Sequence, residues 1–383
     1  MTDFDEHNEE VRRVWDAYRA GRPTRVPMVL GINVRFTMFD HPANPQRIDF
    51  ERYFADPETM LRRQLEHLEY IRFYVPADHE MGWPEEWRIE VDFQNVYEAA
   101  WFGCPIEFHD GQVPDTVPIL TDDRKRMLFD RGLPDPFEEP FLRRSWEFYS
   151  YFRQAEKQGR THKGIPIRAG WPTGLGTDGP MTVCCNLRGT TEFCLDLMED
   201  PGYAEELLDF VTEAIARRIE AYRRELGLPV VQDGFGWADD SVALLSVEQY
   251  REFVLPRHRR LVERLSTGGP NSVHLCGDAT RHFRTLRDEL NVRSFDTGFP
   301  VDFGRLRQEL GPDVEILGGP TVMLLRDGTP EEVEREVVRI LRSGITEGGR
   351  FILREGNNLS PGTPLENIRA MYDAVRREGL YAA

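Results

Sequence analysis

The chain has 383 residues, a net charge of −18 and 40% hydrophobic residues, a composition typical of a large globular protein. The acidic balance argues against binding to nucleic acid or to anionic membranes, and no apolar run reaches the ~20 residues of a membrane span. Five cysteines in this length do not form a disulfide framework, so we expect a protein of the reducing cytoplasm.

Short apolar runs that predict strands alternate with amphipathic segments along the chain. In chain order the expected strands are 26–33, 71–75, 165–169, 230–232, 272–275, 292–295, 314–317 and 351–353. Strands that alternate with helices pair in parallel, and eight such units predict a distorted (β/α)8 barrel, an α/β fold. An open doubly wound sheet is the alternative, but the glycine-rich stretch 170–176 does not open a helix as a phosphate-binding segment would.

Local capping signals mark the predicted helices. The helical stretch 190–226 is interrupted at Asp200-Pro201, and Ser246-Val247-Glu248-Gln249 is a capping box that opens a helix reaching 265. Thr329-Pro330 and Thr363-Pro364 each place a proline at the first helical position. These signals predict helices over 329–342 and 363–379.

Residues 80–160 break the regular alternation, because they are rich in tryptophan, phenylalanine, proline and acids. We expect one domain over 1–383 in which 80–160 is an insertion after the second strand. An insertion there lies at the strand ends and would serve as a lid over the barrel mouth. The alternative is a surface excursion packed by its own aromatic side chains.

The segment His274-Leu275-Cys276 is the strongest chemical signal. Side chains two apart on a strand point to the same side, so the imidazole and the thiol are expected to lie together. This pair suits zinc or another borderline-soft metal. The competing interpretation is a hydrogen-bonded core histidine beside a small buried cysteine.

Polar and aromatic residues follow the other predicted strands and would converge on the same mouth of a barrel. Crowded carboxylates need a cation or a substrate group to offset them, which favours a metal at His274 and Cys276. Asp239 and Asp240 are candidate catalytic acids, although they could equally cap the following turn. The candidates at strand ends are Asn33, Arg35, Trp171, Trp237, Asp239, Asp240, Asp296, Glu355 and Asn358.

Several ordered motifs give the chain a resemblance to one superfamily. They are Asp178-Gly179-Pro180, the run from Asp239 to Pro256, His274-Leu275-Cys276-Gly277, Leu317-Gly318-Gly319-Pro320, Gly328 to Val333 and Pro361 to Asn367. On these segments the chain resembles the uroporphyrinogen decarboxylase superfamily, from about Thr177 to Glu378 and more loosely in the N-terminal third. The resemblance implies a distorted (β/α)8 barrel and a homodimer.

The superfamily has two branches, and the chain departs from both patterns. Uroporphyrinogen decarboxylases carry two arginines after the first strand, where this chain keeps only Arg35. Zinc- and corrinoid-dependent methyltransferases pair the His-x-Cys motif with a further cysteine after the last strand. Here His274 and Cys276 match, but Asn357 stands where that cysteine falls, and Glu355 or an acid such as Asp239 would complete an oxygen-richer site.

The resemblance implies a metal-assisted methyltransferase or demethylase that works with a corrinoid (cobalamin) carrier protein and a small organic methyl donor or acceptor. Zinc would be held by His274, Cys276 and Glu355, with Asp240, Asp239 and Arg35 in catalysis. Asn33, Trp171, Trp237, Asp296 and Asn358 would contact the substrate. The alternatives are a cofactor-free decarboxylase that uses Arg35 and an aspartate, and a non-catalytic barrel that binds a ligand or a corrinoid.

Overall fold

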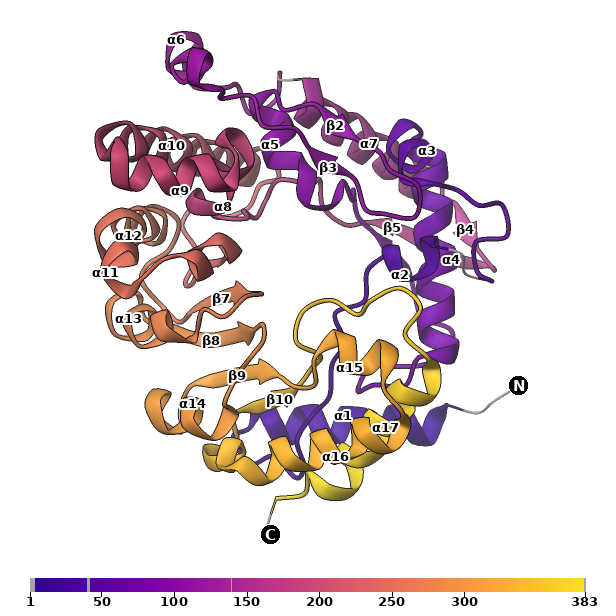
Figure 1. Ribbon diagram of the computed structural model, residues 1–383. Coiled ribbons are helices and arrows are strands. Elements are labelled where there is room, and N and C mark those ends of the chain that lie inside the picture. The colour runs from indigo at the N-terminus through magenta and orange to yellow at the C-terminus, as the bar shows by residue number, and fades with distance from the viewer. Residues whose placement is uncertain (1–3, 40–41, 139, 382–383) are drawn as a thin grey trace.

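The structure, a computed structural model, describes residues 4–39, 42–138 and 140–381. Its elements are arranged around a ring, with helices such as α12, α13 and α14 outside and strands such as β7, β8 and β9 inside (Figure 1). The C-terminal half builds one side of this ring as a regular parallel sheet, whereas the N-terminal half completes it with shorter pieces of sheet.

The regular side is a five-stranded parallel sheet in the order β10-β9-β8-β7-β6. Its strands are β6 (Gly236–Ala238), β7 (Asn271–Leu275), β8 (Val292–Thr297), β9 (Glu315–Gly318) and β10 (Phe351–Leu353). The connecting helices are α12 (Leu255–Leu265), α13 (Thr280–Leu290), α14 (Phe303–Leu310), α15 (Val322–Asp327) and α16 (Pro330–Ile340). The register sets Ala238 beside His274 and His274 beside Asp296, so the chemistry predicted for separate strands meets at one edge.

The other side is less regular. Strand β1 (Trp87–Ile89) pairs in parallel with β5 (Ile165–Ala169), and β4 (Thr161–His162) adds to β5 in the antiparallel sense. A separate antiparallel pair is formed by β2 (Ile106–Glu107) and β3 (Asp115–Thr116). The helices of this part are α1 (Asp5–Arg19), α2 (Arg35–Met38), α3 (Phe50–Ala55), α4 (Pro57–Tyr74), α5 (Tyr97–Phe102), α6 (Met127–Arg131) and α7 (Pro140–Lys157).

Between the two sides the chain is joined by single hydrogen bonds, and the strand ladder does not close within the ranges that the structure describes. The predicted first strand, 26–33, is extended chain beside β10: Val29 N donates to Leu353 O at 3.0 Å and Leu353 N to Pro27 O at 2.9 Å. Pro27 has no N–H group to continue the ladder, which is one physical reason why no full strand forms there.

Two strand predictions are wrong. Residues 71–75 are apolar and aromatic, but all except Val75 belong to helix α4, which begins at Pro57 after Asp56 accepts a hydrogen bond from Thr59 N at 2.9 Å. That N-terminal cap outweighs the local strand preference. Residues 230 and 231 are bends and Gln232 forms only an isolated bridge with Ser266, so the strand of that unit is β6 at 236–238.

Residues 80–160 take part in the ring, because β1 lies within them and pairs with β5. Trp87 and Trp101 of this stretch are fully buried in the hydrophobic core, whereas Trp83 and Phe108 are exposed. A lid role for this stretch stays a prediction.

The capping signals are confirmed where local hydrogen bonds decide the helix start. Asp200 separates α9 (Thr190–Glu199) from α10 (Pro201–Glu225), and the capping boxes at Ser246 and Thr329 form. The helix after Thr363 differs, because α17 (Leu365–Glu378) has no side-chain cap. The remaining helices are α8 (Pro180–Arg188) and α11 (Val247–Gln249), and no helix of the described residues is long and apolar enough to cross a membrane.

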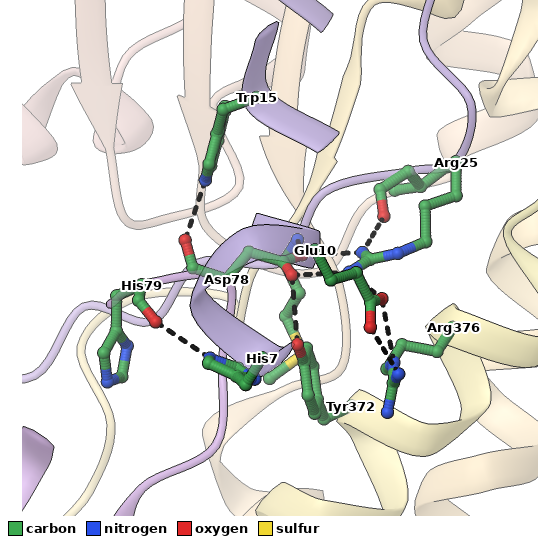
Figure 2. Close-up of polar contacts among 10 residues, drawn as sticks. His7, Glu10, Trp15, Arg25, Asp78, His79, Tyr372 and Arg376 are labelled. Carbon is green, nitrogen blue, oxygen red and sulfur yellow. Dashed lines mark hydrogen bonds and ion pairs between the residues drawn. The ribbon is translucent and has the colours of Figure 1, made fainter. Parts of the chain in front are cut away.

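A buried polar cluster, here called the Asp78 cluster (Glu10, Arg25, Asp78 and Tyr372), ties the chain's first and last helices to the ring (Figure 2). Arg25 donates two hydrogen bonds of 2.6 and 2.7 Å to the Asp78 carboxylate, which also accepts from Met28 N and from the Tyr372 hydroxyl. Glu10 of α1 bonds the same guanidinium. The cluster therefore fastens α1 and α17 across the irregular part of the ring.

Candidate metal centre

Three side chains that can ligate a metal meet at the carboxyl ends of β6 and β7. The ligand atoms of Asp240, His274 and Cys276 all lie within 4.8 Å of one another. His274 and Cys276 come from the end of β7, and His274 Nε2 lies 2.9 Å from Cys276 Sγ. Asp240 follows β6, and its Oδ1 accepts a hydrogen bond of 2.7 Å from Cys276 N, which fixes the carboxylate beside the thiol.

The orientation of His274 is set by the neighbouring strand. Asp296 Oδ2 lies 2.6 Å from His274 Nδ1, which leaves Nε2 directed at Cys276. Burial by itself would lower the pKa of His274, but the hydrogen bond and charge of Asp296, together with the charge of Asp240, raise it. Arg354 pairs with the same Asp296 oxygen, so the carboxylate is held from two sides.

Cys276 is held close to its neighbours by main-chain packing. Burial, followed by the Asp240 carboxylate, raises the pKa of the Cys276 thiol above its usual range. A cation is what would hold this buried sulfur as a thiolate. Gly298 lies so close that a Cβ atom there would stand 1.6 Å from the Cys276 carbonyl oxygen, so only glycine fits beside this end of β7.

The donor set fits a borderline-soft divalent cation. It offers one imidazole nitrogen, one sulfur and one carboxylate oxygen, all of which zinc accepts. Asp296 supplies the carboxylate that commonly supports a metal-bound histidine. Its second oxygen, Oδ1, is buried without a hydrogen-bond partner among the described residues.

Glu355, predicted as a metal ligand, is not among the residues whose ligand atoms lie within 4.8 Å of one another. Its Oε1 accepts a hydrogen bond of 2.7 Å from Gly31 N, and its Oε2 is buried without a partner in the described structure. Burial raises the pKa of Glu355 to about 7. Gly31 is needed here, because a Cβ atom would collide with Arg354, Glu355 and Asn358.

The two neighbouring aspartates, both predicted as catalytic, have different surroundings. Asp240 lies with the two other candidate metal ligands, whereas Asp239 is fully buried and accepts hydrogen bonds from Met181 N and Thr182 N at the start of α8. His258 Nε2 lies 2.9 Å from Asp239 Oδ2. The Asp239 side chain therefore caps the start of α8, and not the following turn that the alternative interpretation of this pair named.

Arg35 is the first residue of α2, and Asn33 lies two residues before it. Asn33 Oδ1 accepts a hydrogen bond of 3.1 Å from Arg35 N. Burial lowers the pKa of Arg35, against the opposing charges of Asp92 and Cys276, and its Nε has no partner among the described residues. The guanidinium is thus near enough to Asp92 and to Cys276 for both to favour its charged form.

The predicted aromatic walls also separate. Trp171 is 38% exposed and lines a 290 Å³ cavity at the ends of β1 and β5, together with Asp92 and Tyr97. Trp237 is 5% exposed and stacks on Phe235, so it belongs to the core beside the centre. The larger cavity of 650 Å³ is lined by residues of 38–50 and 109–112, away from the metal ligands.

Sequence reasoning missed the buried ion pair that holds Asp178. Burial, with the charges of Glu98 and Asp240, raises the pKa of Asp178 well above its usual range. Glu98 accepts a hydrogen bond from Asp178 N and pairs at 2.6 Å with Arg218, and both members of that pair are buried. The Asp178-Gly179-Pro180 motif was the available signal, whereas nothing local marked Glu98 or Arg218.

The chain is similar to known proteins of one family. The family model described as uroporphyrinogen decarboxylase (URO-D) matches residues 12–378. A methylated-thiol–coenzyme M methyltransferase of Methanosarcina mazei is 33% identical over 206 residues, 51% of each chain. A uroporphyrinogen decarboxylase of Prochlorococcus marinus is 28% identical over 179 residues, 46% of this chain and 48% of its own. These matches span about half the length of the relatives.

The fold is shared over a longer stretch. A solved methyltransferase from Methanosarcina mazei superposes with a TM-score of 0.62 at 19% identity, covering 96% of this chain and 98% of the other. This likeness supports the ring of strands and helices expected from the alternating pattern. With the family model matched over nearly all of its length, the chain belongs to the uroporphyrinogen decarboxylase (URO-D) family.

Proposed function

We propose that the protein is a metal-dependent methyltransferase that passes a methyl group between a small organic substrate and a corrinoid on a carrier protein. The observation that carries the proposal is the meeting of Asp240, His274 and Cys276 at the strand ends. The 33% identity to a methyltransferase over half of each chain supports the same class of chemistry.

Asp240, His274 and Cys276 would hold zinc, which would supply a Lewis acid for a methyl-bearing atom or activate an acceptor. The chain's own residues orient this site. Asp296 fixes the ring of His274 through Nδ1, and the Cys276 main chain holds Asp240 in place.

Other residues around the centre would exchange protons and contact the substrate. Glu355, with a pKa of about 7 and an unpartnered Oε2, can hold or release a proton near neutral pH. Trp171 offers an exposed ring in the cavity at the ends of β1 and β5. Arg35, Asn33 and Asn358 complete the polar surroundings expected of a substrate site.

The direct test is the zinc content of the purified full chain and of a Cys276→Ser variant, by mass spectrometry after incubation with zinc and removal of excess metal. We expect about one zinc per wild-type chain. The zinc affinity of Cys276→Ser should be weaker by at least the about 10–100-fold that changes to the partners of metal ligands cost. Cys194→Ser is the matched control, because Cys194 lies on α9 and is also only partly buried. A wild-type chain that binds no zinc contradicts the proposal.

The methyl-transfer part of the proposal has its own readout. Methylcobalamin and cob(I)alamin have different visible spectra, so exchange of the methyl group with thiols and with methyl ethers or thioethers can be followed directly. We expect exchange with at least one such substrate in the wild type and its loss in Cys276→Ser. A zinc-loaded wild type that exchanges with none of them leaves a metal protein without this activity.

A cofactor-free decarboxylase is the second candidate, and Arg35 is the observation that favours it. Its buried guanidinium, with Nε unpartnered in the described structure, suits a substrate carboxylate. Release of carbon dioxide from a carboxylated substrate in the presence of a chelator, abolished by Arg35→Gln, would support this candidate over the methyltransferase.

A further inference from the structure

Asn357 holds an unusual backbone conformation beside the metal centre. Its φ angle is +122°, whereas the other positive-φ residues that are not glycine lie between +49° and +54°, in the ordinary left-handed region. Backbone strain of this kind persists only where the surroundings impose it, and it is concentrated at functional sites. A residue other than glycine at this position therefore points to a use for its side chain.

The side chain of Asn357 reaches the sulfur of the centre. Cys276 Sγ donates a hydrogen bond of 3.1 Å to Asn357 Oδ1, and His274 Nε2 lies 2.9 Å from the same sulfur. Donors that bind one zinc ion at about 2.0–2.3 Å stand roughly 3–4 Å from one another. The amide oxygen is therefore spaced from Cys276 as a further donor of the same cation would be.

The main chain around Asn357 is fixed from both sides. Its N–H donates to Glu355 O at 2.9 Å, and its carbonyl accepts from Arg354 Nη2 at 3.4 Å. Glu355 is bonded in turn to Gly31 N, and Arg354 to Asp296. The strained residue is thus attached to the group that orients His274.

We propose that Asn357 Oδ1 is a fourth donor of the cation site, which then offers one nitrogen, one sulfur and two oxygens. This inference rests on the proposed function. A site with one thiolate leaves the cation harder and more Lewis-acidic than a site with two. Such a site is better suited to polarise the oxygen of a methyl donor, as in a methyl ether, than to activate a methyl acceptor as a thiolate.

The test uses the metal-free full chain titrated with Co²⁺, with zinc affinity measured by competition. Asn357→Gly removes the donor and also the strain, because glycine adopts this φ freely. We expect it to be no less stable in urea than the wild type but to bind both metals about tenfold more weakly or worse. If Asn357 had a purely structural role, the substitution would not weaken metal binding while leaving the stability in urea unchanged or higher.

Asn357→Cys tests whether the position reaches the cation. A second thiolate would raise the near-ultraviolet sulfur-to-Co²⁺ absorption to roughly twice the wild-type intensity, as expected when two thiolates bind where one did. Asn291→Gly is the matched control, because Asn291 also has positive φ (+49°) but lies at the end of α13. We expect its metal affinity and spectrum to match the wild type.

Two outcomes overturn the inference and leave the proposed function standing. They are unchanged affinity in Asn357→Gly, and a Co²⁺ complex of Asn357→Cys whose sulfur absorption equals that of the wild type. A wild-type chain that binds neither Zn²⁺ nor Co²⁺ overturns both the inference and the proposed function.

Discussion

The Asp78 cluster and the metal centre are both partly or fully buried groups of charges, but they are completed in different ways. The Asp78 carboxylate accepts four hydrogen bonds, from two Arg25 nitrogens, Met28 N and Tyr372. At the centre, Asp296 Oδ1 and Glu355 Oε2 are buried with no partner among the described residues. Buried polar groups are normally satisfied, so the first cluster is complete within the fold, and the unpartnered oxygens of the second agree with the proposed cation site.

The largest effect should follow from breaking the satisfied cluster. Asp78→Ala leaves the buried Arg25 guanidinium without its main partner, and we expect a loss of about 3–5 kcal/mol in the free energy of unfolding. Urea denaturation measures it. Asp16→Ala, at an exposed ion pair on α1, should change stability by no more than about 0.5 kcal/mol.

His79, the residue next to Asp78, should make the protein sensitive to acid. Burial, then Arg72 and His7, lowers the pKa of His79 to about 4, so the unfolded chain binds an extra proton between about pH 6.5 and 4. Stability is therefore lost as the pH falls through this window, by up to about 3 kcal/mol. As the pH falls, the urea midpoint of the wild type should drop more than that of His79→Gln. Midpoints that depend on pH in the same way in both proteins would contradict the lowered pKa of His79.

The metal centre should show the opposite pH dependence through Glu355. Its pKa of about 7 exceeds the usual value of 4.5, so the folded chain binds the extra proton between about pH 4.5 and 7. Stability should fall as the pH rises through this window, by up to about 3 kcal/mol relative to Glu355→Gln. The measurement is urea unfolding in a chelator at several pH values, and a gap between the two proteins that stays constant would count against it.

The smallest expected effect is the one specific to the centre. Zinc at 100 times its dissociation constant should stabilise the protein by about 2.7 kcal/mol, because it binds the folded chain. This gain should vanish in His274→Ala and persist in a destabilised Asp78 variant. Loss of the gain in both variants would mean that the two clusters are not independent.

The parts predicted correctly from the sequence are those decided by neighbours in the chain. Strands β5, β7, β8, β9 and β10 were anticipated from their apolar runs, and the helix starts at Ser246 and Thr329 from their capping boxes. The error at 71–75 has the same local origin, since a strand-like composition at the end of α4 was read without the cap at Asp56.

The site could be predicted only in part, because its members are joined by contacts distant in sequence. His274 and Cys276 share a strand face and were predicted together, whereas Asp240, which lies beside them, was predicted as a catalytic acid and Glu355 as the third ligand. Neighbouring aspartates leave the chain in different directions, so sequence could not say that Asp239 would cap α8 instead. The hydrogen bond between Asn357 and Cys276 spans 81 positions, and only the family resemblance, which sets Asn357 where a further cysteine falls, related the two residues.

The way in which α17 joins the first segment sets an order for folding. Tyr372 and Asp78 are 294 positions apart, and residues 24–26 bond the main chain of Gly379 and Tyr381. Such contacts form late, because the loop between them must first be closed. During synthesis, Asp78 and Arg25 can pair early. The contacts that join the two ends of the chain form only when residues 372–381 have left the ribosome. The N-terminal third therefore cannot complete its contacts with the rest of the ring until the C-terminal helix has been made.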